Sequence, residues 1–166
     1  LTTPGVWERA AAEVSEVLGD RPPGRQDLAR LTYLDGVVHE TLRLYPPAVV
    51  SARKVATGFE FGGREVRAGS MLLYSPYVTH RLPELWSEPL RFRPERWMTT
   101  DPDHPKRGLH EYLPFSAGAH RCIGATLATT ELTVMLARLL ARRDLRLPEQ
   151  DIRPTSFAAM RPKHGL

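Results

Sequence analysis

The residues best suited to chemistry surround the one cysteine of this 166-residue chain, Cys122, which lies between glycines before an alanine- and leucine-rich run. A thiol close to a helix N-terminus meets the positive end of the helix dipole and can accept backbone N–H groups, which favours the thiolate. Gly118 and Gly124 allow the backbone to bend sharply and to approach a flat partner closely. Arg121 adds positive charge beside the sulfur. One thiolate on a short, glycine-flanked loop suits a metal that takes a single soft protein ligand.

Three interpretations compete for Cys122. A free cysteine is most often a buried structural residue. A nucleophile with His120 as its base is a second interpretation, although side chains two residues apart on a loop need not meet, and no third residue that would orient the base is evident. The third is ligation of haem iron by the thiolate, which pushes electron density onto the iron and favours O–O cleavage. The residue types alone leave all three open.

The ten residues from 115 to 124 resemble the cysteine loop of the cytochrome P-450 family, Phe-x-x-Gly-x-Arg-x-Cys-x-Gly. Every fixed position is matched except one, because His120 stands where the family usually has arginine. The resemblance implies that the cofactor is haem b (iron protoporphyrin IX), with Cys122 as its axial thiolate ligand. It also implies that His120 pairs with a haem propionate and that the two residues after the cysteine offer N–H groups to the sulfur. The implied cofactor-binding residues of the loop are Phe115, Gly118, His120, Ile123 and Gly124.

A second resemblance involves Glu40 and Arg43, which lie three residues apart on a predicted helix and can pair on its surface. Taken alone, they could equally be a solvent-exposed pair worth roughly a few tenths of a kcal/mol. With Arg96, in the segment Pro-Glu-Arg-Trp, they resemble the family's Glu-x-x-Arg helix and its Pro-Glu-Arg-Phe segment. The resemblance implies a buried three-membered network that is structural, not catalytic, and that holds the coil behind the cysteine loop.

Further site residues follow from the same resemblance. Arg53 falls where family members carry an arginine that binds a haem propionate, a task that suits a planar guanidinium; without the resemblance it would be an exposed strand arginine. We expect His80 to be a surface histidine, with a propionate contact as the alternative. The residues implied to line the substrate pocket are Ala48, Val49, Val50 and Phe157.

The elements that must position these residues are mainly helical. Apolar residues at helical spacing predict helices over residues 4–18, 33–45 and 123–143. Thr3 is expected to cap the first of these, and the last is expected to be mostly buried. Alternating residues around Gly62-Gly63 predict a β-hairpin within residues 58–75, and proline-rich coil is expected over residues 82–121. The fold class is therefore mainly α with small β-hairpins (α+β), and the resemblance makes residues 1–166 a single partial domain, the C-terminal haem-binding portion of the P-450 fold.

The composition is that of an ordinary globular protein, with 42% hydrophobic and 25% charged residues and a net charge of +4. No run of like charges and no repeated aromatic–basic pattern suggests a nucleic-acid partner. One cysteine excludes an internal disulfide and favours a reducing compartment. No apolar run approaches the roughly 20 residues that a membrane span needs. We therefore expect a cytoplasmic protein, although the sequence leaves an upstream membrane anchor open.

The function implied by the resemblance is haem-thiolate monooxygenation: O2-dependent hydroxylation of a small hydrophobic organic substrate. The electrons would come from a redox partner, either a ferredoxin, a flavodoxin or a reductase. The alternative is a non-catalytic haem-binding or non-functional fragment, because the family's long oxygen-activating helix has no counterpart here. The residues expected to form a basic surface for an acidic electron donor are Arg93, Arg121, Arg138 and Arg142.

Overall fold

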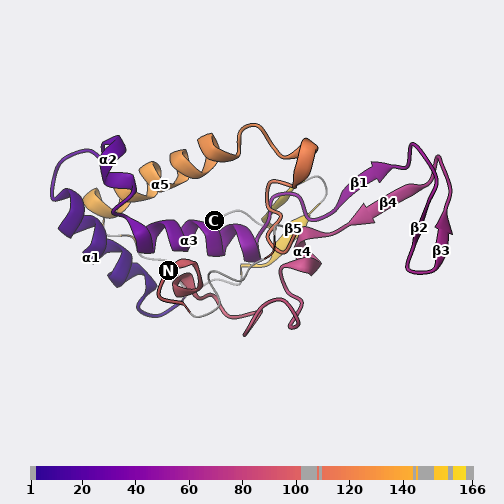
Figure 1. Ribbon diagram of the computed structural model, residues 1–166. Coiled ribbons are helices and arrows are strands. Elements are labelled where there is room, and N and C mark those ends of the chain that lie inside the picture. Colours follow the sequence, from indigo (N-terminus) through magenta and orange to yellow (C-terminus); the bar gives the residue numbers. More distant parts are fainter. Residues whose placement is uncertain are drawn as a thin grey trace.

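The computed structural model describes residues 3–101, 108, 110–143, 145, 152–156 and 159–163. Three longer helices gather at one end of the molecule, and a narrow ribbon of strands extends from the other end (Figure 1). The predicted fold class, mainly helical with small antiparallel sheets, is confirmed. The helices are α1 (Val6–Leu18), α2 (Arg25–Leu28), α3 (Thr32–Leu44), α4 (Pro76–Thr79) and α5 (Ala125–Arg142), with 3-10 turns η1 (Pro94–Trp97) and η3 (Gly118–His120).

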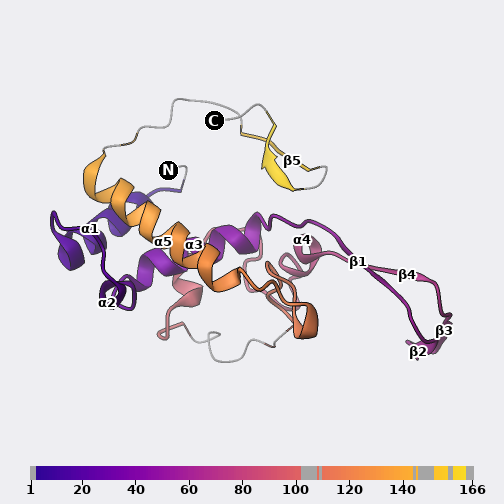
Figure 2. The same cartoon turned by 90° about the horizontal axis from the view of Figure 1, so that it is seen from above.

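The core lies where α1, α3 and α5 meet, and Figure 2 shows α5 crossing α3. Helix α1 contributes a buried stripe at helical spacing, and α5 contributes Ala137, which is fully buried. Small and branched apolar side chains allow the three helices to pack closely. The fully enclosed members of this cluster are Ala10, Val14, Leu18, Leu31, Tyr33, Leu34 and Ala137.

Helix α1 begins two residues later than predicted. Gly5, with φ +77°, precedes the first helical residue, Val6, and no side chain caps the helix. The expected cap, Thr3, instead accepts a hydrogen bond from Val6 N–H through its backbone carbonyl at 3.4 Å. The left-handed backbone at Gly5 breaks the helix there, so Pro4 lies in a turn and is not the first residue of the helix.

The strands form three separate two-stranded sheets among the described residues. Gly62 and Gly63 both have positive φ, as a two-residue hairpin turn requires, and they connect β2 (Phe59–Phe61) to β3 (Arg64–Val66). This hairpin lies within the predicted residues 58–75, and the strand that follows it does not belong to the hairpin. Strand β4 (Met71–Tyr74) pairs instead with β1 (Ser51–Lys54), because the chain turns back at Gly69, whose N–H donates to Val55 carbonyl. The third sheet pairs β5 (Pro154–Ser156) with β6 (Met160–Pro162).

Helix α5 is much less buried than its apolar sequence predicts. Its buried residues are Ala125, Thr133 and Ala137, whereas Leu127 is 63% exposed and Met135 is 69% exposed. Helices α1 and α3 cover only one side of α5, so the remaining apolar residues face away from this core. No helix among the described residues is long and apolar enough to cross a membrane.

The coil that follows α4 has an aromatic cluster as its buried core. Trp86 is 1% exposed, and its ring lies 5.9 Å from that of Trp97, which in turn lies 4.5 Å from the ring of Tyr112. These large rings bury apolar area without a helix or sheet to carry them. The cluster holds this coil against α3.

Gly36 lies where α3 packs closely against η1. A Cβ atom at this position would lie 2.7 Å from the Pro94 carbonyl oxygen, closer than real Cβ atoms come to other atoms. Alanine is normally the better helix former, but we expect Gly36→Ala to lower the free energy of unfolding by about 1–3 kcal/mol, because backbone must move to admit the methyl group. Chemical denaturation measures this. Thr130→Ala, on the exposed side of α5, is the control and should be neutral or slightly stabilising; a stabilising Gly36→Ala would contradict the close contact.

Candidate functional site

The cysteine loop, residues 115–124, is closed on itself by backbone hydrogen bonds. The Cys122 N–H donates to Phe115 carbonyl at 2.9 Å, and the Arg121 N–H donates to Gly118 carbonyl at 3.1 Å. Ser116 and Gly118 have φ values of 61° and 67°, in the left-handed region. Serine rarely adopts this conformation, and such strain persists only where surrounding contacts hold it. The turns of the loop are therefore held both by its own backbone hydrogen bonds and by contacts from outside the loop, such as Arg53 with Ser116.

The thiol of Cys122 is exposed, so the interpretation as a buried structural cysteine is wrong. The residue lies just before α5, whose first residue, Ala125, donates its N–H to Cys122 carbonyl at 3.3 Å. In the described part of the chain, no group accepts a hydrogen bond from the N–H of Ile123 or Gly124. The nucleophile interpretation also gains no support, because no hydrogen bond among the described residues joins Cys122 to His120, which is exposed.

The surroundings of Cys122 fit a flat, largely apolar group such as haem. A Cβ atom at Gly124 would lie 3.8 Å from Sγ, so no side chain at that position crowds the sulfur. Ile123, next to Cys122 in the chain, and Leu127, in the first turn of α5, have exposed apolar side chains, 104% and 63% exposed. An exposed sulfur at the start of a helix can supply one soft ligand to a metal. The donor and the apolar surface around it are both suited to a porphyrin face.

Arg53 lies against the cysteine loop. Its Nη2 donates to Ser116 Oγ at 3.2 Å and to the Tyr74 hydroxyl at 3.3 Å, and these two hydroxyls lie 2.8 Å apart. Arg53 is therefore half-buried, not the exposed strand arginine that its strand alone would suggest. The hydrogen bond with Ser116 and the charge of Arg53 lower the pKa of Tyr74. The sequence pattern did not indicate Ser116 or Tyr74, because their contacts join residues 21 to 63 positions apart.

The buried carboxylate of Glu40 binds both predicted arginines. Its Oε2 accepts from Arg43 Nε at 2.8 Å, and its Oε1 accepts from Arg96 Nε at 2.9 Å. Glu40 and Arg43 are 0% exposed and Arg96 is 1% exposed. The structure thus brings the three residues together, with the two guanidinium groups sharing one carboxylate. Burial alone would raise the pKa of Glu40, but the hydrogen bond and charge of Arg43, and the charge of Arg96, outweigh it and lower the pKa.

Trp97 is a further donor to this carboxylate that the sequence reasoning missed. Its indole N–H donates to Glu40 Oε2 at 2.9 Å, and the backbone N–H of Arg93 donates to Oε1, also at 2.9 Å. The remaining guanidinium N–H groups bind carbonyls of the coil, among them Arg43 to His80 and Arg96 to Ser87. A fully hydrogen-bonded carboxylate is what makes such a buried charge tolerable.

His80 is completely buried, so the prediction of a surface histidine is wrong. Its Nδ1 lies 2.9 Å from Arg43 carbonyl, and its Nε2 accepts the Leu113 N–H at 2.7 Å. Both ring nitrogens are thus engaged by backbone, which leaves none for a propionate. Burial, and then the charges of Arg43 and Arg81, lower the pKa of His80 to about 4. The imidazole is therefore neutral near neutral pH.

Among the described residues, those predicted for the substrate pocket and for the basic surface do not form one compact cluster. Residues 48–50 lie between α3 and β1, where Val50 is 55% exposed, and Phe157 lies outside the described residues. Of the proposed basic surface, Arg93 is already paired, since its Nη2 lies 2.9 Å from the carboxylate of Asp101. Arg121 and Arg142 are exposed, and Arg138 is half-buried.

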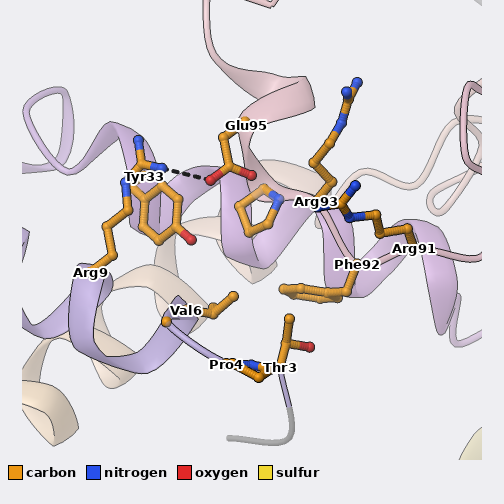
Figure 3. Close-up of a pocket in the computed structure, with 11 residues that line it drawn as sticks. Thr3, Pro4, Val6, Arg9, Tyr33, Arg91, Phe92, Arg93 and Glu95 are labelled. Carbon is orange, nitrogen blue, oxygen red and sulfur yellow. Dashed lines mark hydrogen bonds and ion pairs between the residues drawn. The ribbon is translucent and has the colours of Figure 1, made fainter.

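A cavity of about 300 Å³ lies at the start of α1, bordered by residues 91–95 (Figure 3). Arg9 crosses one side of it, 2.6 Å from Glu95 and 4.1 Å from the ring centre of Tyr33. Its lining includes no residue of the cysteine loop and none of residues 48–50. The cavity is therefore separate from the predicted substrate pocket.

Removing the charge of Glu40 should be far more costly than removing an exposed one. We expect Glu40→Gln to lower the free energy of unfolding by about 3–5 kcal/mol, because two buried guanidinium groups lose their counter-ion. Glu95→Gln is the matched control: it breaks an ion pair with Arg9 whose side chains are 49% and 42% exposed, and it should cost about 1 kcal/mol or less. Urea denaturation compares the two. Equal losses would mean that the Glu40 network contributes no more than a surface pair.

The neutral state of His80 should make stability depend on pH. Its pKa is about 4 in the folded chain against 6.5 for an unperturbed histidine, so the unfolded state binds more protons between these values. Stability is therefore fully present above about pH 6.5 and falls as the pH drops towards 4, by about 3 kcal/mol in total. Denaturation curves at several pH values measure this, with His80→Gln as the control that lacks the group. Parallel pH profiles for the two proteins would contradict the assignment.

Known proteins share the sequence features of this chain. The model of the family "Cytochrome P450" matches residues 1–165. Putative cytochrome P450 139 of Mycobacterium tuberculosis (strain ATCC 25618 / H37Rv) is 59% identical over 169 residues, covering 100% of this chain and 39% of that protein. Cyclooctat-9-en-7-ol 5-monooxygenase of Streptomyces melanosporofaciens is 46% identical over 143 residues, covering 86% of this chain and 31% of that protein.

A solved structure agrees with the sequence matches. Retinoic acid-bound cyanobacterial CYP120A1 superimposes with a TM-score of 0.86 at 28% identity, over 95% of this chain and 36% of that one. The chain thus spans less than two-fifths of the solved structure and 39% of the mycobacterial relative. The matched family model, the relatives and the shared fold lead to one conclusion: this chain belongs to the cytochrome P450 family.

Proposed function

We propose that the protein containing this chain is a haem-thiolate monooxygenase, and that Cys122 is the axial ligand of haem b. The observation that carries the proposal is the exposed thiol, held at the N-terminus of α5 by a loop with the family's spacing. Family membership supports the haem-thiolate assignment. Because the chain spans only part of its relatives' length, the proposed activity is that of the whole protein.

The residues of this chain would hold and tune the cofactor. Cys122 supplies the thiolate, and the N–H groups of Ile123 and Gly124 are available to hydrogen-bond the sulfur and to moderate its charge. Haem, when bound, would supply the activation of O2 with two electrons and two protons, so that one oxygen atom enters the substrate and the other leaves as water. Phe115 would pack near the ring, and His120 would pair with a propionate.

Arg53 is suited to hold the other propionate. Its guanidinium is already oriented by Ser116 and Tyr74, so less conformational freedom is lost when it binds a carboxylate. The link through Ser116 also ties this cation to the cysteine loop. One side of the cofactor site would then keep a fixed distance from Cys122.

The substrate class and redox partner follow from the same proposal. A small hydrophobic organic substrate would meet residues 48–50, where a valine side chain is exposed. A relative acting as cyclooctat-9-en-7-ol 5-monooxygenase supports an apolar substrate. Electrons would come from a ferredoxin, a flavodoxin or a reductase, docking near Arg121 and Arg142. We place the protein in the cytoplasm.

The test is the absorption spectrum of the full-length protein, reduced and bound to CO. Thiolate ligation gives a strongly red-shifted Soret band, and we expect Cys122→Ser to lose that band completely, because the hydroxyl does not ionise to replace the thiolate. His120→Ala is the control and should keep the band, since its imidazole is not the ligand. An imidazole-type band in the wild-type protein, or a thiolate-type band that survives Cys122→Ser, would overturn the proposal. A haem-free protein would also overturn the proposal and would favour the non-functional alternative.

A further inference from the structure

His80 links helix α3 to the segment that leads into the cysteine loop. Its ring lies between Arg43 carbonyl, near the end of α3, and Leu113 N–H, two residues before the loop begins. The amide N–H of Leu113 can only donate, so Nε2 must be the acceptor and the ring hydrogen must be on Nδ1, which donates to the carbonyl. The tautomer is fixed by its two backbone partners.

The contact with Arg43 is reciprocal. The imidazole of His80 donates to the backbone carbonyl of Arg43, and the guanidinium of Arg43 donates to the backbone carbonyl of His80 at 2.6 Å. The same arginine binds Glu40 with two hydrogen bonds. His80 is therefore joined directly to the buried ion network and cannot shift without disturbing it.

The contact with Leu113 continues into the loop. Leu113 carbonyl accepts the Ser116 N–H at 3.2 Å, and Phe115 carbonyl accepts the Cys122 N–H at 2.9 Å. A chain of hydrogen bonds thus begins at Nε2 of His80 and ends near the residue that carries the sulfur. Ser116, in the middle, holds the left-handed conformation that turns the loop.

The surroundings keep the imidazole neutral and in place. The rings of Trp86 and Tyr112 lie 6.1 and 5.4 Å from it, and these exclude water. The charged groups that face it are Arg43 and Glu40 of α3, and Arg81 next to it in the chain. The positive charges of Arg43 and Arg81 disfavour protonation of the ring. A proton on Nε2 would also point at the Leu113 N–H and break that hydrogen bond.

We propose that His80 is a positioning residue for the Cys122 thiolate. Its neutral imidazole fastens the segment that leads into the cysteine loop to α3, and so fixes the position of the sulfur relative to α3. The inference rests on the proposed function, because it concerns the thiolate as a haem ligand. His80 does not touch the sulfur, and its effect is exerted through Leu113, Ser116 and the loop backbone.

Two variants of similar size separate the two hydrogen bonds of the ring. The amide of His80→Asn can donate where Nδ1 donates, but it is too short to accept from Leu113. The longer amide of His80→Gln brings its oxygen near the position of Nε2, so it can restore the bond to Leu113. Both variants lose the ring packed against Trp86 and Tyr112, so a purely structural role predicts similar behaviour.

The experiment follows the reduced, CO-bound full-length protein at pH 7 while the thiolate-type Soret band converts to the band without thiolate ligation. We expect the conversion to be about tenfold faster in His80→Asn than in the wild type, with unchanged helical circular dichroism, because one partly buried hydrogen bond is lost. His80→Gln should stay within about threefold of the wild type. Equal rates for the two variants, or no acceleration in His80→Asn, would overturn the inference.

Backbone hydrogen exchange of the peptide over residues 112–122 gives a second readout that does not need the thiolate band. Exchange at Leu113 should be faster in His80→Asn than in His80→Gln; the reverse order, or no difference, would also overturn the inference. A wild-type protein without a thiolate-type band would instead refute the proposed function. Exchange would then still decide whether His80 fastens the loop.

Discussion

The rest of the structure depends on one buried negative charge. The carboxylate of Glu40 is 0% exposed and accepts five hydrogen bonds, from Arg43, Arg96, Trp97 and the backbone of Arg93. An ion taken out of water is tolerated only with such complete pairing. Because its donors come from α3, from η1 and from the residue before η1, satisfying this charge dictates how the coil folds against the helix.

The coil has little other reason to adopt one conformation. Over its described residues, its backbone forms turns and no helix or strand beyond α4, η1 and η3, and its large side chains gather in the aromatic cluster. The two guanidinium groups help to fix its conformation, since each binds Glu40 on one side and coil carbonyls on the other. His80 then passes the constraint to Leu113 and the cysteine loop. The geometry of the cysteine loop therefore depends on hydrogen bonds between buried polar groups as well as on hydrophobic packing.

Local patterns predicted the local features well. The Gly62-Gly63 turn, the stripe of α1 and the cysteine loop each depend on residues close together in sequence. The missed features are contacts between distant residues, such as Trp97 with Glu40 and His80 with Leu113, because no local pattern indicates which distant group a side chain binds. The burial of α5 was overestimated. An apolar face indicates that a helix can pack against a partner, but it does not show whether α1 and α3 cover that face.

The sequence separation of the Glu40 network has a consequence for biosynthesis. Arg96 follows Glu40 by 56 residues, and ribosomes add about 5–20 residues per second. The carboxylate therefore waits roughly 3–11 seconds before its second cation has even been synthesised. During that time α3 can form as a helix, but its acidic side must stay hydrated. The complete network around Glu40 can therefore form only after the segment that carries Arg96 has been synthesised.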